Sequence, residues 1–215
     1  MTPSNNDSSI KPLVNRFLHV SIIAVILLSI AACTASAGKK YYQLFLPLTP
    51  EQAVAPEETA PRIDKVLMIA PVQVDETYQD YRVVYRTSPY ELNYYDYHFW
   101  VKKPDKLVQD VLRDYLSDSH AFRKVISNFP EGTPDLLLKA NVHVIEEVDS
   151  PKIWYGHLKM DFQVRDFKTD TVILTHTFNR QMPFPARKAE HLPGVVSQIL
   201  QEELDLVINE LMKKN

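Results

Sequence analysis

The sequence has few of the residues that nucleotide and thiol sites require. Glycine occurs only at positions 38, 132, 156 and 194, so neither a glycine-rich phosphate loop nor a dinucleotide-binding fingerprint can be written. The single cysteine, Cys33, cannot form a disulfide within the chain. Lysine and arginine form no cluster larger than pairs such as Lys39-Lys40, and the net charge is -3. We therefore expect no nucleic-acid partner.

Catalytic motifs are also missing from the sequence. No serine stands in a nucleophile-elbow motif. The histidines never recur at HxH or HxxxH spacing; those considered are His98, His120, His143, His157, His176 and His191. Three of them, His143, His157 and His176, fall on predicted strands that could be neighbours, which leaves a metal site open beside the simpler interpretation of solvated side chains. We expect no catalytic residues, no metal and no cofactor, and hence not an enzyme.

The N-terminus carries an export signal. Lys11 and Arg16 precede the apolar run VSIIAVILLSI at 20–30, which is followed by two alanines and Cys33. This order of basic, apolar and small residues is typical of a signal peptide. The run is short for a membrane span, which needs about 20 apolar residues, so an uncleaved transmembrane helix is the weaker alternative.

The residues IAAC at 30–33 resemble the bacterial lipobox. This resemblance predicts a signal peptide over 1–32 and acylation of Cys33, which becomes the first residue of a lipid-anchored protein. The alternative is ordinary secretion with cleavage elsewhere, for instance after residues 35–37. Thr34 follows the cysteine where an aspartate would signal retention, and by resemblance to lipoproteins of Gram-negative bacteria this implies the periplasmic face of the outer membrane.

The remaining chain predicts a tether over 33–40 and a single α/β periplasmic domain over 41–215. Alternating residues predict strands at 138–144 and 158–165, with an antiparallel hairpin into 171–180. Apolar residues at helical spacing predict one helix from Pro104 and another over 194–212. Shorter strands are expected at 41–46, 65–74, 82–86, 90–101 and 122–126. We expect an α+β fold with a mostly antiparallel sheet and two helices on one face.

The segment 90–101 is unusually aromatic. Its aromatic residues are Tyr90, Tyr94, Tyr95, Tyr97, Phe99 and Trp100. In an extended strand these side chains occupy both faces. Core packing explains one face, and the other face predicts an exposed patch for a protein partner, self-association or lipid.

Taken in order, these features resemble the ABC-type transport auxiliary lipoprotein family, which includes the PqiC lipoproteins. The matching segments are the lipobox, YYQL at 41–44, VLMIAPVQV at 66–74, HFW at 98–100 and KLVQDVLRDYL at 106–116, with the closing strands and helix. The resemblance implies a non-enzymatic auxiliary component of an MCE-type lipid transport system, in which an ATPase, a permease and an MCE protein move lipids between inner and outer membranes.

The same resemblance implies an MCE-domain partner and a possible homo-oligomeric ring. An alternative is an outer-membrane assembly lipoprotein that binds a β-barrel or a lipopolysaccharide-transport partner, because such a protein would share the anchor and the α/β domain. A periplasmic hydrolase is a third class, and it would need a catalytic constellation that the sequence does not offer.

Overall fold

The structure is a computed structural model that describes residues 38–48 and 62–214. The chain divides into two compact units, Met1–Gly38 and Lys39–Asn215. The predicted signal peptide and Cys33 lie outside the described residues. The unit that begins at Lys39 contains all the regular elements described below.

Two long helices and a sheet of nine strands make up this unit. In chain order the elements are β1 (Lys40–Tyr42), β2 (Ile63–Ile69), β3 (Gln73–Val74), η1 (Glu76–Tyr78), β4 (Arg82–Ser88), β5 (Glu91–Trp100), α2 (Pro104–Asp118), β6 (Phe122–Ile126), η2 (Phe129–Glu131), β7 (Leu136–Asp149), β8 (Trp154–Asp166), β9 (Val172–Pro183), η3 (Ala189–His191) and α3 (Leu192–Lys214). The proline that begins α2 has no backbone N–H to leave unpaired in the first turn.

The expectation of a mostly antiparallel sheet is wrong, because the sheet is mixed and most of its strand pairs are parallel. The pairs β1–β5, β2–β6, β2–β7, β3–β7 and β4–β7 are parallel, and only β4–β5, β7–β8 and β8–β9 are antiparallel. The predicted hairpin over 158–180 is present as β8–β9, and β7 also pairs with β8 in antiparallel. The error came from the other edge of β7, where three earlier strands pair in parallel after long connections that alternation cannot report.

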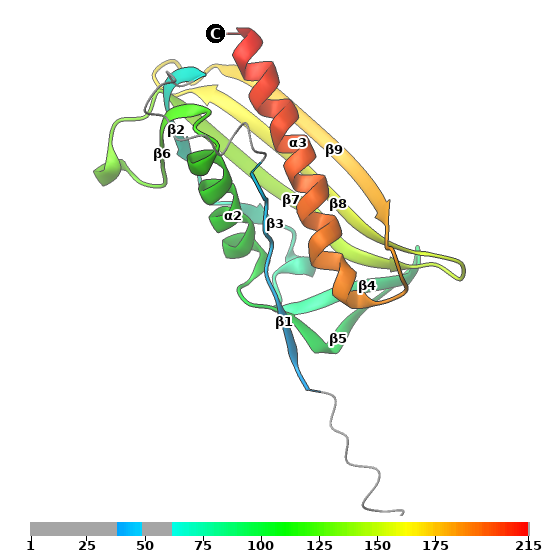
Figure 1. Cartoon of the computed structure of the whole chain (residues 1–215). Coiled ribbons are helices and arrows are strands. Elements are labelled where there is room, and N and C mark those ends of the chain that lie inside the picture. The colour runs from blue at the N-terminus through cyan, green and yellow to red at the C-terminus, as the bar shows by residue number, and fades with distance from the viewer. Residues whose placement is uncertain (1–37, 49–61, 215) are drawn as a thin grey trace, which may run out of the picture. The chain divides into compact units, whose positions relative to one another are not determined.

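Both helices lie on the same side of the sheet in Figure 1, with the N-terminal segment between them. Helix α3 packs on β8 and β9, and α2 packs on β6. The hydroxyl of Tyr115 in α2 donates to the carboxylate of Asp205 in α3 over 2.5 Å. The core fills the space between helices and sheet, and its largest fully buried side chains include Trp100, Phe162 and Leu158.

Residues 43–48 form an extended strap between α2 and α3, although the sequence predicted a strand as far as residue 46. Leu44 and Leu46 are buried in the core. The backbone N–H of Phe45 donates to the hydroxyl of Ser197 in α3 over 3.0 Å. Gln201, one turn further along α3, donates to the carbonyl of Pro47 over 2.8 Å. The N-terminal segment is therefore fixed to the domain by both burial and hydrogen bonds.

Among the described residues, no helix is both long enough and apolar enough to cross a membrane.

Candidate functional site

The six aromatic residues singled out in the sequence lie on or just before β5, and they differ widely in exposure. Tyr90, in the turn between β4 and β5, is 98% exposed, and Tyr97 is 48% exposed. Tyr94, Tyr95 and Phe99 are partly buried. Trp100 is in the core at 1% exposure. The strand therefore has an anchor in the core at one end and a free aromatic side chain at the other.

Four aromatic rings gather on the face of β5 that is turned toward the helices. The hydroxyl of Tyr42 hydrogen-bonds Nδ1 of His98 at 2.6 Å, and the two rings are stacked. The ring of Tyr95 lies 4.8 Å from that of His98 and 4.5 Å from that of Tyr85. Burial, together with the charges of Glu190 and Glu147, raises the pKa of Tyr42 to about 12. This cluster joins β1, β4 and β5.

Glu147 of β7 is hydrogen-bonded to this cluster. The hydroxyl of Tyr95 donates to one carboxylate oxygen of Glu147 over 2.8 Å. The other oxygen is buried without a hydrogen-bond partner among the described residues. Burial, aided by the negative charge of Asp149, raises the pKa of Glu147 to about 7 despite the hydrogen bond from Tyr95. Burial disfavours the charged imidazolium and, together with the positive charge of Lys40, lowers the pKa of His98.

Glu146, the preceding residue, points to the opposite face of the sheet and has a full set of partners. It accepts hydrogen bonds from the Tyr78 hydroxyl at 2.7 Å and from the Arg86 guanidinium at 2.8 and 3.1 Å. Nδ1 of His157 lies 3.4 Å from the same carboxylate. Burial opposes ionisation, but the hydrogen bonds from His157, Arg86 and Tyr78 outweigh it and lower the pKa of Glu146 to about 2. The pKa values of these adjacent glutamates are thus shifted in opposite directions.

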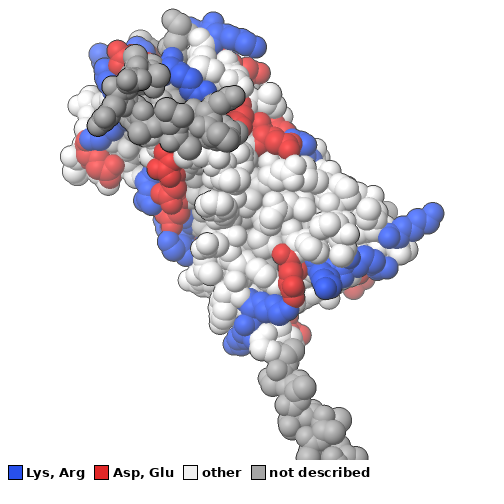
Figure 2. Space-filling view, in the orientation of Figure 1, with Lys and Arg blue, Asp and Glu red and all other residues white. Residues whose placement is uncertain are grey.

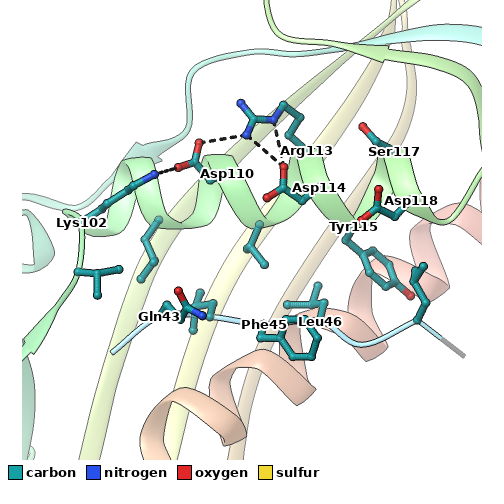
Figure 3. Close-up of a pocket in the computed structure, with 15 residues that line it drawn as sticks. Gln43, Phe45, Leu46, Lys102, Asp110, Arg113, Asp114, Tyr115, Ser117 and Asp118 are labelled. Carbon is teal, nitrogen blue, oxygen red and sulfur yellow. Dashed lines mark hydrogen bonds and ion pairs between the residues drawn. The ribbon is translucent and has the colours of Figure 1, made fainter. Parts of the chain in front are cut away.

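A groove of about 490 Å³ runs between the strap and α2. Figure 3 shows its apolar floor from the strap and its charged rim from the helix. On the rim, Lys102 pairs with Asp110 at 2.5 Å, and Arg113 pairs with Asp114 at 3.1 Å. Asp110, Asp114 and Asp118 of α2 line this groove. These two ion pairs neutralise most of the charge on the rim of the groove.

The histidines that left a metal site open have separate partners. His143 bonds Asp161, His157 bonds Asn179 at 2.6 Å, and His176 bonds Glu203 at 2.6 Å. In residues 38–48 and 62–214 no three His, Cys, Asp or Glu side chains are grouped so that they could hold a metal ion.

Comparison with known proteins identifies the family. The model of the ABC-type transport auxiliary lipoprotein component matches residues 42–205. The chain belongs to this ABC-type transport auxiliary lipoprotein family. The resemblance found in the sequence is therefore confirmed. The match covers the strap, α2, most of the sheet and the first part of α3.

Solved structures share the fold of this auxiliary lipoprotein. Protein XCC0632 from Xanthomonas campestris, of the family DUF330, is 15% identical over 82% of this chain and 99% of its own, with a TM-score of 0.67. An uncharacterized protein is 17% identical over 81% of this chain and 99% of its own, with a TM-score of 0.65. At these identities the likeness shows the fold alone. No curated protein matches the chain.

Sequence reasoning located the aromatic strand but missed the two buried glutamates. The signal was present, because Glu146 and Glu147 interrupt the end of an apolar alternating strand. Charged residues in such a position need buried partners. The residues that supply them come from other elements, and their identity depends on the pairing of β7 with β4, which lies far earlier in the sequence.

Proposed function

We propose that this auxiliary lipoprotein is a non-enzymatic part of an ABC transporter that moves lipids between the inner and outer membranes, with an MCE-domain protein as its partner. Acylated Cys33 holds it on the periplasmic face of the outer membrane. The exposed aromatic residues of the β4–β5 hairpin form its contact with the partner or with further copies of itself.

The observation that carries this proposal is the exposure of aromatic side chains on a member of a transport auxiliary family. Tyr90 at 98% and Tyr97 at 48% exposure present large rings to solvent. Tyrosine is enriched at protein interfaces because it buries much apolar area and still offers a hydroxyl for hydrogen bonding. The hairpin that carries these rings is itself held to the core by Trp100.

The edge of β5 supports an oligomer. Strand β1 pairs with β5 only through the register from Lys40↔His98 to Tyr42↔Trp100. Residues 91–97 of β5 therefore have no strand on their outer edge among the described residues. An open edge of this kind is a template for another strand. A strand from a second copy or from the partner would cover it and bury Tyr97.

Crosslinking in the native membrane tests the proposed partner. The full-length lipoprotein is crosslinked mildly and purified, and the captured proteins are identified by mass spectrometry. We expect an MCE-domain protein with its permease and ATPase. A β-barrel or lipopolysaccharide-transport machinery without an MCE protein would contradict the proposal and favour the assembly role.

A matched pair of variants connects the capture to the hairpin. Tyr90→Ser combined with Tyr97→Ser should reduce recovery of the MCE protein at least several-fold. Phe129→Ser removes a ring whose exposure, 61%, lies between those of Tyr97 and Tyr90, from η2 beyond β6. It should leave recovery unchanged. An equal loss in both variants would show that exposed aromatic side chains bind the partner nonspecifically.

Fractionation of membranes tests the location. Thr34→Asp changes only the residue after Cys33 and is expected to move the protein from the outer-membrane to the inner-membrane fraction. Cys33→Ser should abolish incorporation of labelled palmitate and release the protein from membranes. If the Cys33→Ser variant stayed in the outer-membrane fraction, acylation of Cys33 would not be what holds the protein on the membrane.

A further inference from the structure

Basic and aromatic side chains alternate on the face of the β1–β5–β4 region that is turned away from the helices. Tyr41 and Phe99 are register partners and their rings stack at 5.6 Å. The ammonium of Lys39 lies 5.3 Å from the centre of the Phe99 ring. Arg82 is opposite Phe99 on β4, and its guanidinium lies 4.5 Å from the Tyr94 ring. We call Lys39, Tyr41, Arg82, Tyr94 and Phe99 the tether-end patch.

The patch is distinct from the helix-facing cluster described above. Register partners on neighbouring strands place their side chains on the same face, and successive residues alternate between faces. The register shift between Arg82 and Val84 interrupts this alternation in β5, so that Tyr94, opposite Val84, lies on the same face as Phe99, opposite Arg82. Tyr42 and Trp100 therefore point inward to the core, while Tyr41 and Phe99 point outward. Tyr41 is 61% exposed although it is a large ring. The core does not account for this row of side chains.

The short chain between Cys33 and Lys39 limits how far the patch can lie from the lipid anchor. Lys39 is six residues after Cys33. An extended chain spans at most about 3.6 Å per residue, so Lys39 lies within about 22 Å of an acylated Cys33. The strap fixes the following residues to α3 through Ser197 and Gln201. The domain therefore cannot move away from the anchor by releasing more tether without breaking these contacts.

The composition of the patch matches a bilayer surface. Tyrosine and other aromatic rings concentrate at the membrane interface, where one part of the ring is apolar and the hydroxyl is hydrated. Lysine and arginine beside them attract anionic headgroups. On the helix side of the molecule, which Figure 2 shows, basic and acidic side chains lie together at the end where the described chain begins. Arg82 is paired with Asp80 at 2.7 Å, whereas Lys39 is in none of the ion pairs of the described residues, so Lys39 supplies the free positive charge of the patch.

We propose that the tether-end patch docks on the phospholipid headgroups of the membrane that holds the lipid anchor, and so sets the orientation of the domain on that membrane. This inference rests on the acylation of Cys33 in the proposed function. The patch adds a second contact to the anchor, and two contacts fix an orientation that a single flexible tether leaves free.

Depth-dependent fluorescence quenching tests the docking. Full-length lipidated protein is reconstituted into vesicles of phosphatidylethanolamine and phosphatidylglycerol that contain lipids brominated near the headgroup. An introduced cysteine carries the fluorophore, because the only native cysteine is Cys33. Asp96→Cys places the probe on β5 beside the patch, and Lys168→Cys places it in the turn between β8 and β9. We expect several-fold stronger quenching at position 96 than at position 168.

Variants separate the patch from the anchor. In the Asp96→Cys background, Tyr41→Ser with Phe99→Ser should lower quenching to the level of position 168. Phe129→Ser, in η2 after the opposite edge strand β6, should not. Lys39→Glu changes one exposed charge, leaves the fold intact and should also lower quenching, with a weaker effect at high salt. Thermal unfolding of each variant verifies that it is folded.

The outcomes distinguish this inference from the function it rests on. Equal quenching at positions 96 and 168 with mass spectrometry showing acylated Cys33 would overturn the docking alone. An unmodified Cys33 would overturn both the anchor and the docking. Loss of self-association in the patch variants without any change in quenching would assign the patch to a second copy and also overturn the inference.

Discussion

The β7–β8 and β4–β5 hairpins use the same antiparallel pairing but distribute their side chains differently. In β7–β8 the pairing runs from Leu136↔Asp166 to Asp149↔Trp154 with a register shift at Val142/Val144. One face of this hairpin is apolar and lies under α3. In β4–β5 the register shifts twice, between Arg82/Val84 and between Arg86/Ser88. Its faces carry tyrosines, histidine and arginine, several of them half-exposed.

This difference separates the residues that stabilise the fold from those available for contacts. The apolar face of β7–β8 supplies side chains with 2% exposure or less, namely Leu138, Ala140, Val142, Ile145, Leu158, Met160, Phe162 and Val164. The β4–β5 hairpin is held by fewer apolar contacts and by hydrogen bonds to buried carboxylates. We expect substitutions in the first hairpin to change stability, and those at the tip of the second to change binding alone.

The largest effect is expected from the core of the first hairpin. Phe162→Ala removes a ring that is 1% exposed and lies 6.0 Å from the ring of Phe178. Truncation of a buried phenylalanine leaves a cavity and costs about 3–5 kcal/mol of unfolding free energy. Urea denaturation of the purified domain measures this loss. A loss below about 1 kcal/mol would show that α3 is not packed against this face.

The junction of the two hairpins gives the next largest effect, and it depends on pH. Glu147 has an ordinary carboxyl pKa of 4.5 when unfolded and about 7 when folded. Between these values the folded chain holds a proton that the unfolded chain releases, so the stability of the protein falls as the pH rises from 4.5 to 7. Glu147→Gln should remove this fall and stabilise the protein by about 3 kcal/mol above pH 7.

Glu146→Gln is the control for that result because the two residues are adjacent and have opposite shifts. The folded pKa of Glu146 is about 2, below its ordinary 4.5. Its contribution to stability is therefore present above pH 4.5 and is lost as the pH falls toward 2. Glu146→Gln should destabilise the protein at pH 7 and leave Arg86 without its carboxylate. Chemical denaturation from pH 4 to 8 would contradict this interpretation if both variants changed stability in the same direction.

These two regions also differ in how far the sequence predicts them. The β7, β8 and β9 strands were predicted because alternation and turn residues act over a few neighbouring positions. The parallel pairs of β1 with β5 and of β4 with β7 join segments about fifty or more residues apart, and no local pattern specifies them. The aromatic strand was located correctly for the same local reason. Its partition into a helix-facing cluster, an outward patch and a free tip required the register.

A smaller effect is expected at the strap, where the predicted strand gave way to an extended segment. Ser197→Ala deletes the hydroxyl that accepts from the Phe45 backbone N–H, and Ser197 is 5% exposed. Loss of one such hydrogen bond costs about 1 kcal/mol. Amide hydrogen exchange at Phe45 should accelerate, whereas exchange in β7 and β8 should not. Unchanged exchange at Phe45 would show that burial of Leu44 and Leu46 alone holds the strap.

The smallest effect on stability is expected at the tip of the β4–β5 hairpin. Tyr90 is 98% exposed, so Tyr90→Ser removes almost no buried area and should change the unfolding free energy by less than about 0.5 kcal/mol. A change in capture of the transport partner without a change in stability would confirm that the tip serves binding. A loss of stability above about 1 kcal/mol would instead show that Tyr90 stabilises the fold. It would contradict the expectation that substitutions at the tip of the β4–β5 hairpin change binding alone. Thermal unfolding and membrane crosslinking of the same preparation provide both measurements.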